Sequence, residues 1–436
     1  MNGGGARGSG RVSIRAAAFA ASAPAASLGA MTPPVPPRIV FATPAWPPSR
    51  TQNGIATYVG FLRAGLAAHG APSAAIAGDW ADDGDPLAVP SVHGTGLPFV
   101  RRCRRALARR LHADGGLSFA IADGIALAAQ RLARRWSFDA IEIEESFGIA
   151  AALPRSLPPV IVRLHGPWFL TGAASGVPAD DAFRTRVAAE WRGMQRAAIV
   201  TAPTQALLDA VRTQYGALPA RTAVVPNPGP RPATDGWSPG TSRRIVHVGR
   251  FERLKGSDVV LDAFASLASR FPDAELAIVG PDLGMRMADG SLANYDAFVR
   301  ARGYPAAVTA RIRFHGPMPP AEVTALRRAS AISVVASRYE NFPMTVLEAM
   351  ADGCPLVATA VGGIPEMLRD GHTARLCPAG DAAALAAALA DVLGNPTAAA
   401  ERAAAARADY AQRFTPDAVA ARMLALYRDL LPAARS

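Results

Sequence analysis

Cysteine and long apolar runs are both scarce in this chain of 436 residues. Its three cysteines, Cys103, Cys354 and Cys377, lie far apart and lack the paired spacing that a structural zinc site or a disulfide framework requires. We therefore expect a reducing, cytosolic location. The apolar stretch at residues 120–129 is shorter than the roughly 20 residues that cross a bilayer, so a membrane-spanning helix is not expected.

Lysine is rarer still, because Lys255 is the only lysine among 46 basic residues. A compact ammonium meets an anion differently from the planar guanidinium of arginine. A composition that otherwise uses arginine therefore indicates a position where an ammonium serves better. Composition alone leaves open the alternative that one lysine remains by chance.

The formal net charge of +11 includes one dense basic run in which Leu107 and Leu111 are interleaved. Such an amphipathic run suits a solvated helix face, a patch for an anionic membrane or, least favoured, a nucleic-acid site. No zinc-finger spacing or RNP-like motif supports the last, so we expect no nucleic-acid partner. Docking on the inner face of the plasma membrane remains a hypothesis. The run consists of Arg101, Arg102, Arg104, Arg105, Arg109 and Arg110.

Residues 1–37 are rich in glycine, alanine, serine and proline and lack a periodic apolar pattern. We interpret them as a disordered tail, or as the result of a start codon assigned upstream of Met31. From residue 38, short β-branched runs alternate with longer alanine- and leucine-rich stretches, which is typical of βα units in a parallel sheet. Strands are expected at residues 39–42, 74–77, 140–144, 160–164, 198–202, 244–248, 275–279, 312–315, 331–335 and 355–358.

A proline-rich stretch at residues 226–240 interrupts this alternation and predicts an interdomain linker. The alternation then restarts, so the chain is expected to hold two tandem Rossmann-like, doubly wound α/β domains at residues 38–235 and 236–412. Apolar residues at every third or fourth position predict a helix at 416–431. This helix belongs to a C-terminal segment, 413–436, that could dock on either half.

Each half begins with a strand and a glycine-containing turn, where backbone amides and a helix N-terminus can hold an anion. In the first half the turn contains Asn53 and Gly54, with a helix expected from about residue 56. In the second half the turn contains Arg250 and Lys255. Because these two residues are five positions apart in a loop, they could converge on one phosphate group.

A second polar cluster lies further along the second half. Pro343 suits the first turn of a helix, which leaves the amides of Met344 and Thr345 free at the positive helix end. Glu348 lies one turn beyond Met344 and Glu340 lies in the preceding loop, so the two carboxylates could bracket a ligand. Taken singly, each glutamate is better explained as a helix-start acid or a solvated residue.

Two further motifs complete the set. Gly362 and Gly363, followed by Glu366, place flexible glycines before a helix start, where the backbone could approach a ligand closely. An Asp-x-Asp motif at Asp83 and Asp85 would suit a metal-dependent transferase of a different fold. We interpret it as an acidic loop, because it lies in a polar cluster and would leave the second half unexplained.

In this order the motifs resemble the donor half of family 4 retaining glycosyltransferases, which have the GT-B fold of two Rossmann-like domains facing a central cleft. The resemblance extends from Ile39 to Leu431 and implies a C-terminal helix that crosses back to the first domain. It rests on Gly-Arg-x4-Lys-Gly at residues 249–256, Glu-x7-Glu at 340–348, Gly-Gly-x-x-Glu at 362–366, Val279-Gly280, Phe314-His315-Gly316 and Val225-Pro226-Asn227.

The resemblance implies a role for each matched residue. Arg250 and Lys255 would hold the donor's diphosphate, Glu348 would hold the nucleotide ribose, and Glu340 would bind the hydroxyls of the transferred sugar, beside His165. Asn53 and Ala374 stand where the family usually has glycine, although asparagine tolerates positive φ better than most residues. The predicted catalytic residues are His165, Glu340, Arg250 and Lys255. The predicted donor-binding residues are Asn53, Gly54, Arg250, Lys255, Asn341, Phe342, Pro343, Met344, Thr345 and Glu348.

The resemblance also implies a reaction. A retaining transferase moves a sugar from a nucleotide sugar to an acceptor hydroxyl, and the positive groups at the leaving diphosphate would make a metal ion or other cofactor unnecessary. We predict a glycan or lipid-linked acceptor and a role in envelope polysaccharide or glycolipid synthesis. Glu144 and Glu145 in the first half are candidates for facing the acceptor, although a surface position explains them equally well.

Two other functions fit the same architecture. A non-hydrolysing nucleotide-sugar 2-epimerase also holds a diphosphate between two domains. A nucleotide-sugar-binding scaffold would keep the pocket without turnover. Retention of both glutamates together with Arg250 and Lys255 argues against the scaffold.

Overall fold

The computed structural model describes residue 1 and residues 35–51, 53–80, 82–91, 116–232, 234–238, 240–287 and 289–431. It separates the chain into Met1–Val35 and Pro36–Ser436, and every helix and strand given below lies in the second unit. The arginine run at residues 101–110, Cys103 and nearly all of the expected tail lie outside the described residues.

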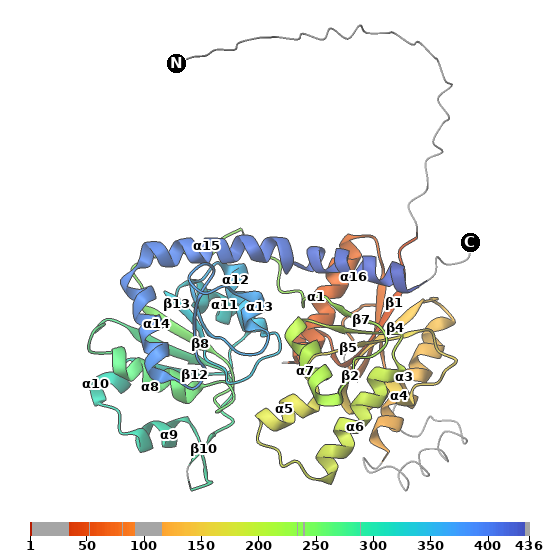
Figure 1. The fold of residues 1–436 in the computed structure, drawn as a ribbon, viewed down its shortest axis with the longest axis horizontal. Coiled ribbons are helices and arrows are strands. Elements are labelled where there is room, and N and C mark those ends of the chain that lie inside the picture. Colours follow the sequence, from red (N-terminus) through yellow and green to blue (C-terminus); the bar gives the residue numbers. More distant parts are fainter. Residues whose placement is uncertain are drawn as a thin grey trace. The chain divides into compact units, whose positions relative to one another are not determined.

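The first half contains a parallel sheet of seven strands in the order β3-β2-β1-β4-β5-β6-β7 (Figure 1). The chain starts at β1, moves outward to β2 and β3, and returns to β4 on the other side of β1. The boundary between β1 and β4 is therefore a topological switch point. The strands are β1 (Ile39–Trp46), β2 (Ser73–Trp80), β3 (Ala88–Pro90), β4 (Ala140–Glu144), β5 (Val160–Arg163), β6 (Ile199–Ala202) and β7 (Thr222–Val224).

The second half repeats this plan with a parallel sheet of six strands in the order β12-β9-β8-β13-β14-β15. Its switch point lies between β8 and β13, where His247 pairs with Val334. The strands are β8 (Arg244–Val248), β9 (Glu275–Val279), β12 (Ile312–Gly316), β13 (Ile332–Val335), β14 (Leu356–Thr359) and β15 (Arg375–Cys377), with a separate hairpin of β10 (Met285–Arg286) and β11 (Leu292–Ala293). Two doubly wound parallel sheets confirm the predicted α/β architecture.

Helices connect the strands of both sheets. Those of the first half are η1 (Pro48–Arg50), α1 (Gly54–Ala68), α3 (Leu117–Ala133), η2 (Ser146–Gly148), α4 (Ile149–Ala152), α5 (Trp168–Ala174), α6 (Asp181–Arg196) and α7 (Gln205–Tyr215). The later ones are α8 (Ser257–Leu267), α9 (Tyr295–Arg302), α10 (Ala306–Thr309), α11 (Pro320–Arg328), α12 (Met344–Asp352), α13 (Ile364–Met367), α14 (Ala382–Gly394), α15 (Pro396–Arg413) and α16 (Pro416–Leu430). Asp180, Thr204 and Asp381 begin α6, α7 and α14, because each side chain accepts a hydrogen bond from a free backbone amide.

Every strand expected from the sequence is present, and β4, β8 and β9 have the expected bounds. The helix expected at residues 416–431 is α16. The strands that were not expected are the short edge strands β3, β7 and β15 and the two-residue strands β10 and β11.

Each sheet has its own buried core. Ile141, Val162 and Val200 from neighbouring strands are fully buried in the first. Ile245 and Ile332 are fully buried in the second. Runs of buried β-branched residues are typical of parallel sheets that helices cover on both faces.

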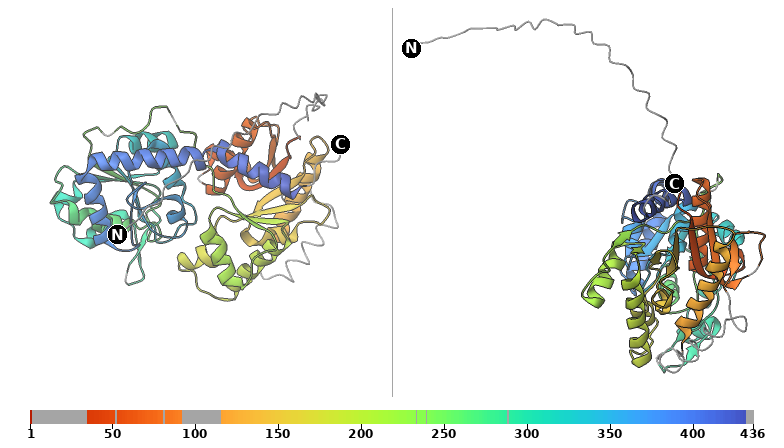
Figure 2. Two further views of the ribbon diagram at one scale, coloured as in Figure 1. Left: turned by 45° about the horizontal axis from the view of Figure 1, so that its top comes forward. Right: turned by 90° about the vertical axis from the view of Figure 1, so that its right-hand side faces the viewer.

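The C-terminal helix α16 crosses back to the first half. Val419, Met423 and Tyr427 of α16 are fully buried in one cluster with Leu62 of α1 and Phe41 of β1. Figure 1 shows α15 passing α12 and continuing into α16 beside α1, and Figure 2 shows the same blue helix against the red-orange start of the fold. The sequence left open which half this helix docks on, and in the structure it docks on the first half.

The proline-rich segment after β7 is packed rather than free. Residues 225–229 are buried, and the amide of Gly229 donates to the carbonyl oxygen of Phe414 at 2.8 Å. The hydroxyl of Tyr410 donates to the carbonyl oxygen of Pro230. A Cβ atom on Gly229 would lie 2.5 Å from the Tyr410 hydroxyl oxygen, so a side chain has no room there. The prolines form a rigid connection against the end of α15; the division at residues 235 and 236 stays a prediction.

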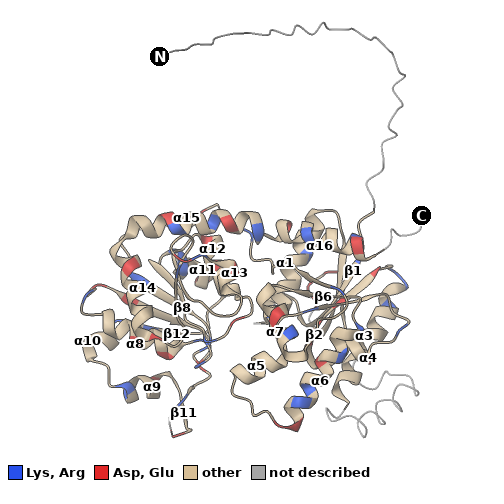
Figure 3. Cartoon of the chain, viewed as in Figure 1, with Lys and Arg blue, Asp and Glu red and all other residues tan. Residues whose placement is uncertain are grey.

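The long helix α15 carries charge of both signs, and Figure 3 shows both acidic and basic residues along it. Arg413 pairs with Asp409 at 2.7 Å, one turn apart.

Within the part of the chain that the structure describes, no single helix is long and apolar enough to cross a membrane.

Candidate active site

The loops that leave β8 and β13 lie side by side at the switch point of the second sheet, because these strands pair directly. The amide of Arg338 donates to the carbonyl oxygen of Leu254 at 2.8 Å, and its guanidinium donates two hydrogen bonds of 2.8 Å to Asp258. Gly256 has a φ of +71°, and a Cβ atom there would lie 1.9 Å from the carbonyl oxygen of Ala336. A glycine is therefore required where the two loops touch.

Lys255 and Glu340 form an ion pair across these loops, with 2.6 Å between Nζ and Oε1. The side chain of Glu340 is 11% exposed, and the hydroxyl of Ser337 donates to the same carboxylate oxygen at 2.7 Å. The structure therefore brings the only lysine of the chain onto a predicted catalytic glutamate. The second oxygen of Glu340 makes no hydrogen bond within the described ranges and can accept one from a ligand.

Arg250 lies on the same loop as Lys255 but binds a different carboxylate. Its Nη2 atom lies 2.7 Å from Oε1 of Glu252, and its side chain is 48% exposed. The predicted convergence of Arg250 and Lys255 on one phosphate group is not formed in this arrangement and requires Arg250 to leave Glu252. Such an exposed ion pair is worth about 1 kcal/mol or less, so a diphosphate could readily displace it.

A buried histidine lies next to the loop that carries Lys255. His247 of β8 contacts the carbonyl oxygen of Val334 through Nδ1 and the hydroxyl of Ser257 through Nε2, both at 3.2 Å. Burial lowers the pKa of His247 to about 4, and the nearby Lys255 contributes to the shift. The ring is therefore neutral at physiological pH and adds no competing positive charge beneath Lys255.

The N-terminus of α12 follows directly after the Glu340 loop. The helix begins at Met344, and Pro343 is the N-cap residue rather than part of the first turn as predicted. No side chain caps this end, which leaves the first amides of α12 at its positive end. Glu348, one turn on, accepts a hydrogen bond of 2.6 Å from the buried Arg327 and is 33% exposed. Arg327 therefore fixes Glu348, which is more than a solvated helix residue.

Asn341 and Phe342 make contacts within the protein. The ring of Phe342 is buried against Phe414, with 5.8 Å between ring centroids, so only its backbone can face a ligand. Asn341 accepts a hydrogen bond from the hydroxyl of Tyr339 and donates one of 2.6 Å to the carbonyl oxygen of His165. Asn341 thus connects a predicted donor-binding loop to the first half.

The two glycines of the Gly-Gly-x-x-Glu motif, Gly362 and Gly363, lie close to the backbone of the Glu340 loop. A Cβ atom on Gly362, which has a φ of +51°, would lie 1.7 Å from the carbonyl oxygen of Glu340. One on Gly363 would lie 2.0 Å from the carbonyl oxygen of Asn341. These contacts pack the turn against the Glu340 loop, and the expected approach to a ligand stays a prediction.

His165 follows β5 in the first half, and Glu145 holds its backbone. The two carboxylate oxygens of Glu145 accept hydrogen bonds from the amides of His165 and Gly166 at 2.9 and 2.6 Å. The imidazole meets the ring of Tyr58 edge-on at 4.9 Å. Burial and, to a lesser extent, the positive Arg163 lower the pKa of His165 to about 3. The imidazole is therefore neutral and can give or accept a hydrogen bond but carries no charge.

The two glutamates expected on the acceptor side differ in their surroundings. Glu145 is 2% exposed and its two oxygens bind backbone amides, so the surface interpretation is wrong for this residue. Glu144 is half-buried at the end of β4 and accepts a hydrogen bond of 3.1 Å from the hydroxyl of Ser146. Burial, followed by the neighbouring Glu145, raises the pKa of Glu144 to about 7.

A third carboxylate belongs to this cluster. Glu190 of α6 accepts hydrogen bonds from the amide of Trp168 at 2.7 Å and from Nε of Arg186 at 3.2 Å. It is 1% exposed, and burial, followed by the charge of Glu145, raises its pKa to about 7.

We expect the Glu190→Gln variant to flatten the pH dependence of stability. A carboxyl whose pKa rises from 4.5 to about 7 on folding stabilises the folded state below pH 4.5, and this contribution is lost as the pH rises through 7. The wild type should lose on the order of 1–3 kcal/mol of unfolding free energy between pH 5 and 8 through Glu190. Urea unfolding at several pH values measures the slope, with exposed Asp181→Asn on the same helix as control. Equal slopes in wild type and Glu190→Gln would contradict the assignment.

The backbone conformation of Asn53 differs from the one expected for the first glycine turn. Its φ is −103°, which is extended backbone, so the tolerance of asparagine for positive φ is not used. Its side-chain oxygen accepts hydrogen bonds from the amides of Ile55 and Ala56 at 2.9 and 3.2 Å. Helix α1 accordingly begins at Gly54, two residues earlier than expected. Asn53 thus caps two of the amides that the sequence suggested for an anion, and the space beside Gly54 is open.

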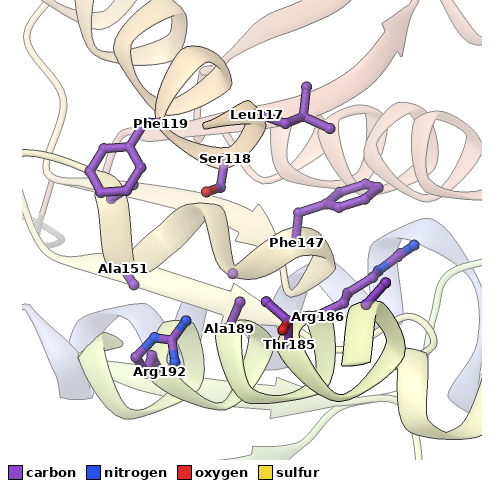
Figure 4. A pocket seen from close by; sticks show the side chains of 12 residues that line it. Leu117, Ser118, Phe119, Phe147, Ala151, Thr185, Arg186, Ala189 and Arg192 are labelled. Carbon is purple, nitrogen blue, oxygen red and sulfur yellow. The ribbon is translucent and has the colours of Figure 1, made fainter. Parts of the chain in front are cut away.

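A pocket of about 450 Å³ opens in the first half next to the glutamate cluster (Figure 4). Figure 4 shows Leu117 and Phe119 of α3 on one side and Ala189 and Arg192 of α6 on the other. Phe147, two residues after Glu145, reaches between them. Its φ of +57° is rare for a residue with a side chain, and such strained positions concentrate at functional sites.

Arg186 and Arg192 are the two positively charged residues among those that line this pocket, and Arg186 is the one held by aromatic rings. Its guanidinium carbon lies 3.9 Å from the ring centroid of Phe147 and 3.7 Å from that of Trp168. These two cation–π contacts and the hydrogen bond to Glu190 fix the guanidinium in place. No aspartate or glutamate is among the described residues that line the pocket. Its charge therefore favours an anionic group beside an apolar one.

The Asp-x-Asp motif has partners within the first half. Asp83 accepts a hydrogen bond of 3.0 Å from the indole of Trp46, and Asp85 pairs with Arg63 at 2.7 Å. These contacts are those of an acidic loop, as interpreted from the sequence. In the ranges that the structure describes, no group of three or more histidines, cysteines, aspartates or glutamates is arranged to hold a metal ion.

Three residues that hold the site together were not predicted. Arg338 clamps the two loops of the second half, Arg327 fixes Glu348, and Glu190 holds the start of α5. Each bonds to a partner at least 21 residues away, so no local pattern reveals the contact. The only signal in the sequence is that Arg338 stands two residues before the first glutamate of the Glu-x7-Glu motif.

The two doubly wound sheets, with the candidate residues in loops at their switch points, define a protein of the GT-B fold. The structure is similar to that of sucrose-phosphate synthase from Thermosynechococcus elongatus, with a TM-score of 0.66 and 22% identity over 90% of this chain and 99% of that one. It is also similar to Anabaena HepE in complex with UDP, with a TM-score of 0.63 and 18% identity over 90% of this chain and 100% of that one. At these identities the likeness shows the fold alone.

The sequence matches two family models. Residues 236–409 match the family model of glycosyl transferases group 1, and residues 53–228 match that of the glycosyl transferase 4-like domain. The chain therefore contains one domain of each kind, as the motifs implied. It is 34% identical over 233 residues to D-inositol 3-phosphate glycosyltransferase of Corynebacterium aurimucosum, a match that covers 50% of this chain and 53% of that protein. The chain spans about half the length of the curated relatives it matches.

Proposed function

We propose that the chain is a retaining glycosyltransferase that moves a sugar from a nucleotide sugar to an acceptor hydroxyl. The observation that supports this most is the 2.6 Å pair of Lys255 and Glu340 at the switch point, beside the uncapped start of α12. A lysine and free helix amides suit a diphosphate, and a carboxylate with a free oxygen suits sugar hydroxyls.

The reaction follows from where charge develops. When the bond between the anomeric carbon and the diphosphate oxygen breaks, negative charge collects on the diphosphate. Lys255 and the amides of Met344 and Thr345 would stabilise it, joined by Arg250 once it leaves Glu252. The acceptor oxygen bonds to the anomeric carbon from the leaving-group face, and its proton passes to the departing phosphate oxygen. Configuration is thereby retained without a protein nucleophile, a metal ion or another cofactor.

The other site residues would position the donor. Glu340 would accept hydrogen bonds from the transferred sugar through its free oxygen, and Glu348, fixed by Arg327, would bind the ribose. His165 would contact the sugar as a neutral hydrogen-bonding group, in keeping with its lowered pKa. Gly54, which has open space beside it, would let the diphosphate approach the start of α1.

The acceptor would bind on the first half. Glu144 is half-buried there and can accept hydrogen bonds from acceptor hydroxyls. The apolar pocket with Arg186 suits the aglycone of a lipid-linked acceptor whose anionic group lies against the guanidinium. Such an acceptor would place the enzyme in the cytoplasm at the inner face of the plasma membrane, in the synthesis of an envelope glycolipid or polysaccharide.

A nucleotide-sugar screen tests this function. UDP and UDP-glucose are the first compounds to test, because a protein of the same fold is solved with them. At a hundredfold excess over Kd, a bound donor should raise the unfolding temperature by about 2–4 °C. Hydrolysis and transfer are then measured with the best binder, in the presence and absence of EDTA. Inhibition by EDTA would contradict the metal-independent mechanism, and no shift with any nucleotide sugar would contradict the function.

Product analysis separates this function from the alternatives. A 2-epimerase would convert the nucleotide sugar without an acceptor and release an epimer. A scaffold would bind the nucleotide sugar without turning it over. The transferase alone makes an acceptor-dependent product with the donor's anomeric configuration.

A further inference from the structure

Glu366 lies in the second half, but its carboxylate binds the first half. Its two oxygens accept hydrogen bonds from the amides of Gln205 and Ala206, at 2.9 and 2.8 Å. These are the first two residues of α7, whose amides have no acceptor within the helix. A carboxylate at this positive helix end is held by charge as well as by hydrogen bonds.

Helix α7 also has a cap next to it in the sequence. Thr204 already caps α7, because its hydroxyl oxygen accepts a hydrogen bond from the amide of Leu207 at 3.3 Å. Glu366 is only partly buried and belongs to the short helix α13, whose apolar residues Ile364 and Met367 supply the buried contacts there. The contact with α7 therefore adds little to either core, and its effect is to join the two halves.

Asn341 makes a second contact of the same kind. Its amide donates to the carbonyl oxygen of His165 in the first half at 2.6 Å. The turn that leads to Glu366 is fixed to the Asn341 loop, since the amide of Gly363 donates to the carbonyl oxygen of Glu340 at 3.1 Å. A side chain at Gly363 would also come within 2.6 Å of Thr204. Both contacts across the halves thus start from one packed unit that contains Glu340.

We infer that Glu366 and Asn341 form a latch that holds the two halves in the arrangement in which the His165 loop meets the Glu340 loop. As to catalysis, this rests on the proposed function, for which His165 and Glu340 would touch the same sugar. Glu366 then acts as a positioning residue, since it touches neither donor nor acceptor. The Gly-Gly-x-x-Glu motif serves closure rather than ligand binding: its glycines permit the packing and its glutamate binds α7.

Hydrogen–deuterium exchange at single-residue resolution tests the latch without any ligand. In the wild type the amides of Gln205 and Ala206 should be protected, and in Glu366→Ala their exchange should speed up by on the order of tenfold. The amide of Leu207, which bonds to Thr204, should change little. Small-angle X-ray scattering of the same two proteins should show a larger radius of gyration for the variant. Unchanged exchange at Gln205 and Ala206, or an unchanged radius of gyration, would overturn the latch.

Asp381→Ala is the matched control. Asp381 also caps a helix with a carboxylate, since it accepts from the amide of Ala384 at 2.9 Å, but both residues lie in the second half. Its removal should expose one helix amide and leave the scattering and the transfer rate at their wild-type values. A comparable rise in the radius of gyration in Asp381→Ala would show that Glu366→Ala acts by general loosening.

Kinetics then test positioning. Glu366→Ala should lower kcat by on the order of tenfold with the Kd for UDP nearly unchanged, and Glu366→Gln should keep part of the rate, because one amide oxygen can still accept. An unchanged kcat, or an equal loss in Asp381→Ala, would overturn the positioning role. If the wild type itself turns over no nucleotide sugar, the proposed function fails, and the positioning role fails with it. In that case, hydrogen–deuterium exchange and X-ray scattering still test whether the latch holds the two halves together.

Discussion

The Lys255→Ala variant is expected to lose about three orders of magnitude in turnover while its fold stays intact. In the proposed function the ammonium stabilises the leaving diphosphate, and removal of one preorganised group that stabilises developing charge costs about 10²–10³ in kcat. The loss should lie at the upper end, because Glu340 would be left without its cation, 2.6 Å away, next to an anionic donor. Steady-state kinetics with the best donor of the screen measure the effect, and thermal unfolding checks the fold.

Two matched variants make this result specific. Arg253→Ala removes one positive charge from the same loop, but its side chain is exposed and its carbonyl oxygen supplies the contact to Arg338, so activity should stay near the wild-type value. Lys255→Arg keeps the charge but replaces a compact ammonium with a larger planar group, and should recover only part of the rate. Near-normal turnover in Lys255→Ala would show that Lys255 does not take part in the reaction. An equal loss of turnover in Arg253→Ala would show that the effect comes from the net charge of the loop rather than from the position of Lys255.

The interior of the fold could be predicted from the sequence because burial leaves a local signal. The strands β8 (RIVHV) and β9 (ELAIV) are short, mainly aliphatic runs rich in β-branched residues, and their expected limits agree with the structure. The edge strands β3, β7 and β15 have three residues each and are only partly buried. Their pairing depends on the neighbouring strand rather than on their own composition, so no pattern predicts them.

The candidate site likewise has features that could be predicted from the sequence and features that could not. The family resemblance implied that Lys255 and Glu340 bind parts of the same donor, and the structure places their side chains 2.6 Å apart. The partner of each charge was not predictable, because it depends on side chains brought together by folding. Arg250 binds Glu252, two residues away, whereas Glu366 reaches Gln205, 161 residues away. Sequence spacing carries no information about the choice between such partners.

The buried network under His165 carries the largest expected effect on stability. Glu142 is 2% exposed, and its two oxygens accept hydrogen bonds of 2.7 Å from the hydroxyls of Tyr58 in α1 and Tyr427 in α16. Burial raises the pKa of both tyrosines, so they remain protonated donors. Arg163, 1% exposed, stacks 5.0 Å from the ring of Tyr58 and donates to Asn227 at 2.6 Å. Burial raises the pKa of Glu142 from its ordinary value, and the positive charge of Arg163 opposes this shift, although the two side chains form no hydrogen bond or ion pair within the described residues.

We expect Glu142→Ala to lower the free energy of unfolding by about 2–6 kcal/mol, because it leaves two buried hydroxyls without an acceptor, at about 1–3 kcal/mol each. Tyr427→Phe keeps the charges and removes one hydrogen bond, so its cost should be about 1–2 kcal/mol. Urea unfolding, followed by the fluorescence of the tryptophans, compares both with the wild type. A cost of Glu142→Ala no larger than that of Tyr427→Phe would mean that Glu142 does not hold both hydroxyls. Because Tyr427 belongs to the C-terminal helix, the same network helps to fix that helix to the first half, together with the apolar contacts of Val419 and Met423.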